Sequence, residues 1–265
     1  MEEVRAKLFT IGCWIGCAFS TAFWATISIL GSLVSGSGRL QHFCMRRWSK
    51  DNLWLSRARV QIEGLENINP NHPQIFVANH SGFHDILSLA ANLPVQFRWV
   101  AKKSLFNIPF MGWHMRRAGY FAIDFENPRS TAKTIGAAAK SIQDGMNAIV
   151  FPEGRRSVDG VLSKFYSGAF SLALRTGVPL VPISLDGSYR VIVPMTPRVN
   201  PGVILRIKIG SPIDLSGYTK ADKHRLMEDV FQVMSRNLEE IRGKRQAGEE
   251  RQDAVFRWIH SNAGH

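Results

Sequence analysis

From about residue 58 onward, short runs of apolar residues alternate with segments of helical periodicity. This alternation is typical of βαβ units, in which helices join parallel strands and cover the sheet. The candidate strands are residues 74–78, 97–101, 120–124, 148–151, 180–185 and 203–209. We therefore predict an α/β fold with a mainly parallel sheet flanked by helices.

Two helices in this region have clear sequence signals. Asn127 and Pro128 are a typical helix start, and the pattern that follows them ends at Gly145. A second amphipathic helix is expected from about residue 220 to 242, followed by a tail of mixed charge. The last candidate strand alternates apolar residues with cations, so we expect one of its faces to contact solvent.

The N-terminal segment carries no charged residue between positions 8 and 38. As a helix, the 27 residues 8–34 are long enough to cross about 30 Å of hydrocarbon. A cleaved signal peptide is the alternative, but its apolar region is usually about 7–15 residues long. Small residues also allow a helix that enters one leaflet and returns; they are Gly12, Gly16 and Ser20. We predict a membrane-associated helical segment.

Residues 39–59 follow with six Lys or Arg, one Asp and several aromatic residues. We interpret them as an interfacial helix that places its cations on anionic lipid. A solvated or nucleic-acid-binding basic helix is the alternative. If the first segment spans a membrane, the positive charge after it places residues 39–265 in the cytoplasm, at the inner (cell) membrane.

The whole chain has 33 Lys and Arg against 21 Asp and Glu, which indicates an anionic partner. Its 45% apolar and 20% charged residues exclude a disordered or collagenous chain. Its three cysteines lack zinc-site spacing and are expected to be reduced. We expect membrane-anchoring helices over residues 1–57, an α/β domain over 58–243 and a charged tail over 244–265.

A polar block follows the candidate strand that ends at residue 78. A helix starting near Gly82 puts Asp85 in its first turn, where its carboxylate can approach His80. Such a contact fixes the imidazole tautomer and leaves the other nitrogen as a base for an alcohol proton. Two alternatives remain: a capped helix with a buried polar loop, and half a metal site that includes His84. No third ligand follows at a recognisable spacing, so we expect no metal.

Cations follow two further candidate strands. Arg155 and Arg156 stand in a glycine turn after residue 151, and guanidinium groups bind phosphate in a bidentate way. We expect Glu153 to keep these arginines oriented; the alternative is a solvated turn with an ion pair. Lys102 and Lys103 follow another strand at the same edge of the sheet.

Four blocks in this order resemble the glycerolipid acyltransferases, specifically the bacterial 1-acylglycerol-3-phosphate (lysophosphatidic acid) acyltransferases. The family motifs are Asn-His-x4-Asp, Lys-x2-Leu-x3-Pro-x2-Gly, Phe-Pro-Glu-Gly-Thr-Arg-Ser and Val-Pro-x2-Pro-Val. The matching positions are Asn79, His80 and Asp85; Lys102, Leu105, Pro109 and Gly112; residues 151–157; and residues 178–183. Residues 58–243 are therefore expected to form an acyltransferase domain.

The resemblance implies that His80 is the general base on the sn-2 hydroxyl of lysophosphatidic acid and that Asp85 orients it. It also implies acyl-CoA or acyl-acyl carrier protein as co-substrate, with no further cofactor. Arg156 and Lys102 would hold the acceptor's phosphate. The full expected substrate-binding set is Lys102, Lys103, Glu153, Gly154, Arg155 and Arg156.

Four positions depart from the family pattern. Arg155 replaces a threonine and Gly82 a serine, while Phe125 and Tyr166 stand where cations are usual. Candidate replacements for the missing cations are Arg155, Lys103 and Lys164. Another lysolipid acceptor, such as lyso-ornithine lipid or another lysophospholipid, therefore stays open, as does a non-catalytic membrane-binding protein. We expect no nucleic-acid partner.

Overall fold

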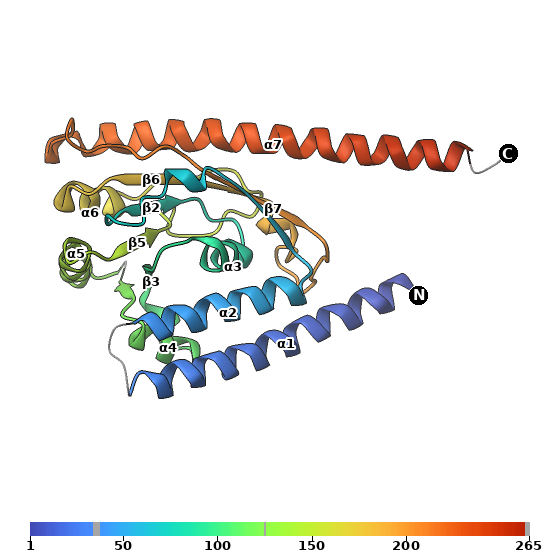
Figure 1. Cartoon of the computed structure of the whole chain (residues 1–265), viewed down its shortest axis with the longest axis horizontal. Helices are drawn as coiled ribbons and strands as arrows, with labels where there is room; N and C mark the ends of the chain where they lie inside the picture. The colour runs from blue at the N-terminus through green and yellow to red at the C-terminus, as the bar shows by residue number, and fades with distance from the viewer. Residues whose placement is uncertain (34–37, 125, 263–265) are drawn as a thin grey trace.

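A single sheet forms the centre of the protein (Figure 1). The computed structural model describes residues 1–33, 38–124 and 126–262. Within these ranges it describes every side chain except those of residues 128 and 248–262. Within this part of the chain the sheet has seven strands in the order β1-β7-β6-β2-β5-β3-β4. They are β1 (Arg59–Glu63), β2 (Ile75–Ala78), β3 (Phe97–Lys102), β4 (Phe121–Ile123), β5 (Asn147–Val150), β6 (Leu180–Asp186) and β7 (Ile204–Ile209).

The sheet is mainly parallel, as predicted. Strands β6, β2, β5, β3 and β4 pair in parallel, whereas β7 pairs antiparallel with β6 and parallel with β1. The six predicted strands are all present. The sequence analysis missed β1, an edge strand in which only Val60 and Ile62 turn inward between polar residues.

Helices cover both faces of the sheet. One face packs against α5 (Pro128–Gln143), α6 (Gly168–Thr176) and α7 (Lys223–Asn262), and the other against α3 (Phe83–Asn92) and α2 (Arg39–Leu55). Strand β2 contributes to both cores, because Ile75 and Val77 face the first layer while Phe76 and Ala78 face the second. All four side chains are fully buried.

The two helices with sequence signals are present. The Asn127 side chain caps α5 by accepting a hydrogen bond from the Ser130 amide at 3.0 Å, and Gly145 follows the helix with φ +97°. Helix α7 begins at Lys223 but continues through Asn262, beyond the predicted end. A short helix that was not predicted, α4 (Met111–Arg117), lies beside α1 (Figure 1).

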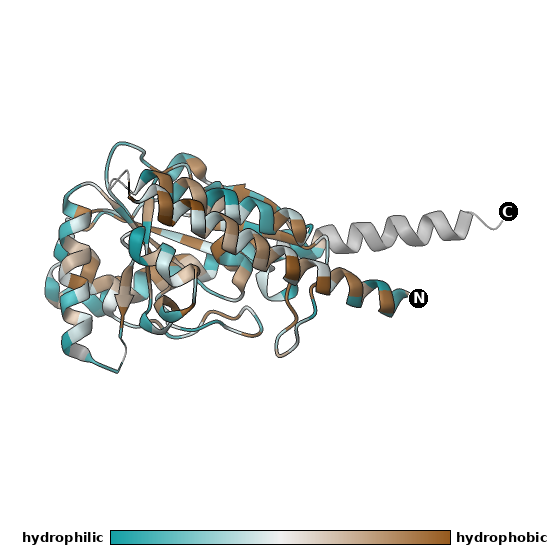
Figure 2. Ribbon diagram, turned by 90° about the horizontal axis from the view of Figure 1, so that it is seen from below, coloured by the Kyte–Doolittle hydropathy of each residue, from teal (hydrophilic) through white to brown (hydrophobic). Residues whose placement is uncertain are grey.

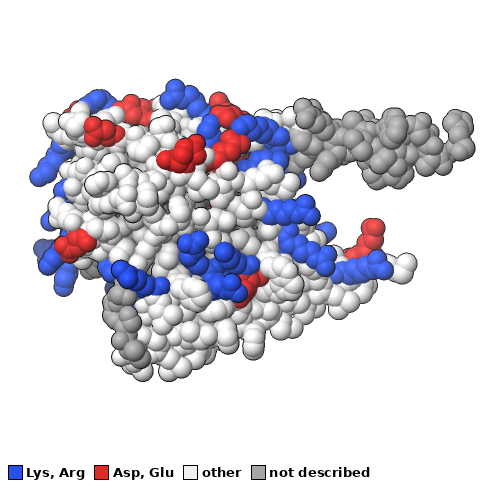
Figure 3. All heavy atoms as spheres, in the orientation of Figure 1, with Lys and Arg blue, Asp and Glu red and all other residues white. Residues whose placement is uncertain are grey.

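Helix α1 (Glu2–Gly31) lies along the outside of the molecule and packs against α2 (Figures 1 and 2). Its buried positions are small or polar, whereas large apolar side chains such as Phe19, 74% exposed, face outward. Figure 3 shows an uncharged lower surface over α1, with Lys and Arg grouped above it at the level of α2. Helix α2 contributes the exposed cations Arg47 and Lys50. By length and composition, α1 is apolar enough to cross a membrane.

Candidate active site

The His80 side chain pairs with Asp85, as the sequence predicted. Helix α3 has Gly82 as its N-cap, so Asp85 lies in the first turn, and its Oδ2 is 2.9 Å from His80 Nδ1. The same oxygen accepts hydrogen bonds from the Ser81 and Gly82 amides at 2.6 and 2.8 Å. A buried carboxylate held by these donors keeps the proton of a neutral His80 on Nδ1 and leaves Nε2 as the basic nitrogen.

The backbone of His80 is fixed as firmly as its side chain. Its amide donates to Glu153 Oε1 at 2.8 Å, and its carbonyl accepts from the Ser157 amide at 2.8 Å. The imidazole also stacks on Phe151, with ring centroids 4.1 Å apart. The loops after β2 and β5 therefore fix the position of His80 together.

The expected role of Glu153 was wrong. Its carboxylate is 1% exposed and accepts hydrogen bonds from the His80 amide and from the amide and hydroxyl of Ser163. Among the described residues, no ion pair joins it to Arg155 or Arg156. Because buried backbone amides need acceptors, Glu153 instead connects three loop segments.

Two residues around the site have roles that the sequence did not reveal. Asn79 bonds both the amide and the carbonyl of Leu185, and so joins the ends of β2 and β6. Gly82 leaves no room for a side chain, because a Cβ there would lie 2.7 Å from the Ser188 carbonyl oxygen. A serine at position 82 would therefore clash with Ser188 unless the backbone moved.

A large apolar pocket of about 500 Å³ adjoins His80. Its walls come from α1, α2, α3, α4, β3 and the loops that follow β2 and β5. Five of the eight predicted site residues line it: His80, Lys102, Gly154, Arg155 and Arg156. They lie together because β2, β5 and β3 are neighbours in the sheet and end at the same edge.

The remaining predicted cation faces elsewhere. Lys103 is exposed and pairs with Asp124 at 3.0 Å, and this ammonium group lowers the pKa of the Asp124 carboxyl. Lys103 does not line the pocket. Lys164 is exposed, and Phe125 lies outside the described residues. Among the candidate replacements for the missing cations, Arg155 is the one that the structure brings to the pocket.

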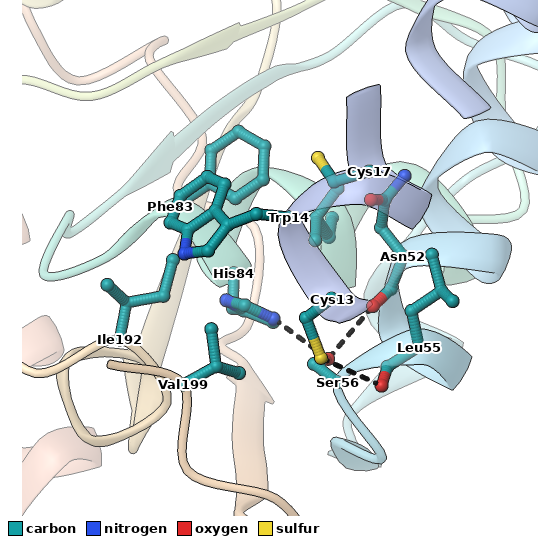
Figure 4. Close-up of a pocket in the computed structure, with 11 residues that line it drawn as sticks. Cys13, Trp14, Cys17, Asn52, Leu55, Ser56, Phe83, His84, Ile192 and Val199 are labelled. Carbon is teal, nitrogen blue, oxygen red and sulfur yellow. Dashed lines mark hydrogen bonds between the residues drawn. The ribbon is translucent and has the colours of Figure 1, made fainter. Parts of the chain in front are cut away.

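His84 does not share a site with His80. Its Nε2 lies 2.9 Å from the Ser56 hydroxyl, in a separate cavity of about 30 Å³ between α1, α2 and α3 (Figure 4). Burial lowers the pKa of His84 to about 4, so the ring is neutral. The two histidines thus point into different spaces, which argues against a shared metal ion. Cys13, Cys17 and Cys44 are unpaired thiols.

This fold and site define the class of the protein. A seven-stranded sheet carries a His/Asp pair and three cations at one edge, beside an apolar pocket. Residues 59–186, which contain these elements, match the family model described as Acyltransferase. These residues form a domain of the acyltransferase family.

Individual relatives narrow this assignment, and they confirm the resemblance predicted from the motifs. The chain is 33% identical over 180 residues to a chloroplastic 1-acyl-sn-glycerol-3-phosphate acyltransferase of Arabidopsis thaliana, covering 66% of this chain and 49% of that protein. It is 26% identical over 189 residues to the 1-acyl-sn-glycerol-3-phosphate acyltransferase of Pseudomonas aeruginosa. That match covers 69% of this chain and 71% of the other protein. This chain thus spans about half the length of the plant relative.

A solved structure agrees over nearly the whole chain. The crystal structure of the 1-acyl-sn-glycerophosphate (LPA) acyltransferase from Thermotoga maritima superposes with a TM-score of 0.79 at 26% identity. The match covers 91% of this chain and 98% of that one.

Proposed function

We propose that the protein transfers a fatty acyl group from a thioester donor to the sn-2 hydroxyl of lysophosphatidic acid, giving phosphatidic acid. The observation that carries this proposal is the His80–Asp85 pair beside a 500 Å³ apolar pocket lined by Lys102, Arg155 and Arg156. The names of the relatives support the same acceptor. A pocket of this size lies within the range of about 300–1,000 Å³ that is usual for small-molecule sites.

The proposed reaction uses His80 as both base and acid. Nε2 takes the proton of the acceptor hydroxyl while its oxygen attacks the thioester carbonyl carbon. The C–S bond then breaks, and the departing sulfur receives the proton from His80. Asp85 stabilises the imidazolium that forms between these steps. Direct attack needs no acyl-enzyme, because the thioester is already reactive.

The three pocket cations bind the anionic parts of the substrates. Arg155 and Arg156 are suited to bidentate contacts with the acceptor phosphate, and Lys102 supplies a point charge. Acyl-CoA and acyl-acyl carrier protein are both anionic, so either donor suits a chain of net charge +12. The apolar part of the pocket holds the acyl chain, and no further cofactor takes part in the reaction.

We also propose that α1 lies within one leaflet rather than crossing the membrane. Thr10 and Trp14 bond to residues 197–199 of the α/β body, and Ser28 bonds to His114. The helix is thus attached along its length, and a crossing would carry the charged α2 into hydrocarbon at high cost. The free cysteines support the cytoplasmic face of the cell membrane.

Turnover by the detergent-solubilised full chain tests the function. We expect lysophosphatidic acid to release thiol from oleoyl-CoA or the carrier-protein thioester, and His80→Ala to lower kcat at least about 100-fold. His72→Ala, at an exposed histidine, is the control. Turnover by His80→Ala within threefold of the parent would exclude His80 as the base. If only another lysolipid supported turnover, the proposed acyl transfer would stand, and that lysolipid would be the acceptor in place of lysophosphatidic acid.

A further inference from the structure

Residues 104–115, which include α4, form an uncharged stretch between two pairs of cations. Two lysines precede this stretch, and Arg116 and Arg117 follow it. Its one titratable side chain, His114, is neutral at pH 7, because burial lowers its pKa to about 4. We call residues 104–115 the α4 segment.

The α4 segment turns large apolar side chains outward. Ile108, Phe110 and Trp113 are 43%, 38% and 49% exposed, and none of the three lines the pocket. The rings of Phe110 and Trp113 contact each other, with centroids 5.2 Å apart. Leu105 and Met111 do line the pocket. The segment therefore has one side on the pocket and an apolar side on the surface of the protein.

The backbone of Phe110 is strained. Its φ of +61° and ψ of −60° lie outside the regions that a bulky residue ordinarily adopts. Phe110 is the central residue of a γ-turn, in which the Met111 amide donates to the Pro109 carbonyl at 2.7 Å. Strained residues of this kind cluster at functional sites. Folding stability alone does not explain a strained turn that holds an aromatic ring at the surface.

The α4 segment adjoins the C-terminal part of α1. Helices α1 and α4 pack together (Figure 1), and His114 Nδ1 lies 2.7 Å from the Ser28 hydroxyl. This part of α1 also exposes apolar side chains, those of Phe23 and Leu30. Two neighbouring elements of the pocket wall thus both have an apolar outer side.

The cations beside the α4 segment are available to an anionic partner. Arg116 and Arg117 are exposed, and within the described part of the chain neither forms an ion pair. Arg116 donates only to the neutral Asn107 side chain, at 3.4 Å. A protein partner would have to combine an apolar centre with acidic groups at its edge. An anionic lipid leaflet has both features at once, since hydrocarbon lies beneath its phosphates.

We propose that the α4 segment is a second membrane contact, which inserts Ile108, Phe110 and Trp113 into the same leaflet as α1. This inference rests on the proposed leaflet position of α1 and is independent of the acyl-transfer step. The aromatic rings lie at the boundary between headgroups and hydrocarbon, where tryptophan is enriched. Arg116 and Arg117 contact anionic headgroups. With two contacts, the tilt of the protein on the membrane is fixed.

A fluorescent label on the full chain in vesicles of phosphatidylglycerol and phosphatidylcholine tests the contact. Ile108→Cys and its matched control Leu65→Cys, at positions 43% and 42% exposed, carry NBD in a Cys17→Ala background. The other two cysteines are buried. Lipids with a nitroxide on the acyl chain should quench the label at position 108 at least about threefold more than the label at 65.

A third label separates this inference from the one on which it rests. Phe19→Cys places NBD on the outer face of α1. Quenching at positions 19 and 108 supports the inference. Quenching at 19, with equally weak quenching at 108 and 65, overturns it and leaves α1 in the leaflet. Disulfide cross-links between Ile108→Cys copies, without lipid quenching, would also overturn it, because a second copy of the chain would cover the segment.

Trp113→Glu gives a second readout without a label. A carboxylate in place of the ring should lower the affinity for the same vesicles about tenfold, measured by co-flotation. Leu65→Glu is the matched control and should bind as the parent does. Thermal unfolding in detergent checks the fold, and Ile108→Glu repeats the measurement if Trp113→Glu does not fold. Affinity equal to that of the parent in a folded variant overturns the inference.

Discussion

At the scale of single residues, the site depends on how completely His80 is held. Its side chain contacts Asp85, its amide contacts Glu153 and its carbonyl contacts Ser157. These partners come from two segments more than 65 positions apart in the sequence. If His80 is the base, as proposed, a ring fixed in this way does not need to be ordered when substrate binds, and such ordering would otherwise slow the reaction.

Asp85→Asn tests whether the Asp85 carboxylate orients the His80 ring or is only a buried polar group beside it. An amide cannot stabilise the imidazolium and permits the wrong tautomer, so we expect kcat to fall by about 10²–10⁴. The variant would be compared by turnover with lysophosphatidic acid and by thermal unfolding. Asp144→Asn, at an exposed position after α5, is the matched control. A kcat within threefold of the parent in folded protein would show that His80 acts without Asp85.

Three histidines with buried ring nitrogens make stability depend on pH. Burial lowers the pKa of His42, His84 and His114 to about 4, below the ordinary value of 6.5. Between these values the unfolded chain binds protons that the folded chain does not, so the free energy of unfolding falls as pH drops from about 6.5 to 4. Each histidine contributes at most about 1.4 kcal/mol per pH unit.

Urea unfolding of the detergent-solubilised protein between pH 4 and 7.5 measures this dependence. His42→Phe should lessen the slope below pH 6.5, because one proton-binding difference is removed. The difference in the free energy of unfolding between His42→Phe and the parent should be smaller above pH 7 than at pH 4.5. A slope equal to that of the parent would mean that His42 is protonated in the folded state.

At the scale of elements, the sequence predicted what local pattern determines. The central strands are continuous apolar runs and α5 has a capping residue, so both could be located. The His80–Asp85 contact followed from helical spacing within one junction. Three other features depend on which strands become neighbours. They are strand β1, the pairing of Lys103 with Asp124 and the partners of Glu153. No local pattern contains that information.

Helix α4 shows how one glycine sets the position of an element. A Cβ on Gly112 would lie 2.1 Å from the carbonyl oxygen of Phe106. Gly112→Ala should therefore displace α4, with His114 and the pocket wall that it forms, at a cost of about 1–3 kcal/mol. Gly136, in α5, has only the Arg175 guanidinium near, at 3.9 Å, and there alanine should stabilise by about 1 kcal/mol.

Urea midpoints of the two alanine variants make the comparison. Both changes add the same methyl group to a helix, so a difference between them reports the contact with Phe106. Gly112→Ala should also lower kcat/KM for long acyl donors. If it stabilised the protein as Gly136→Ala does, the close approach at Gly112 would be absent.

At the scale of the whole molecule, α1 reverses the usual arrangement of a surface helix. A helix of a water-soluble protein buries its apolar face, whereas α1 turns Ser20 and Ser28 inward and Phe19 outward. The uncharged surface over α1 lies below the cations of α2 (Figure 3). These two surfaces fit a membrane in which α1 contacts hydrocarbon and the cations of α2 contact anionic headgroups.

A charge on the outer face of α1 should therefore weaken membrane association. We expect Phe19→Glu to reduce co-flotation with anionic vesicles at least tenfold, because a carboxylate is costly in hydrocarbon. Leu65→Glu, at an exposed apolar position outside α1 and α2, is the matched control and should bind as the parent does. Equal flotation of the two variants would place the membrane contact elsewhere. Arg47→Gln should bind anionic vesicles more weakly than the parent at low salt and lose less binding as salt is raised, because it has one cation fewer to be screened.

The pocket wall includes α1, whose outer face is apolar. Thr21, Trp24 and Ala25 of α1 line the cavity on one side, and Phe19 and Phe23 of the same helix are exposed on the other. A truncation that removes α1 to make the protein easier to handle would therefore open the cavity. Under the proposed function, the width of one helix would separate an acyl chain inside from the lipid tails outside. In that arrangement α1 would be a partition between two hydrocarbon compartments.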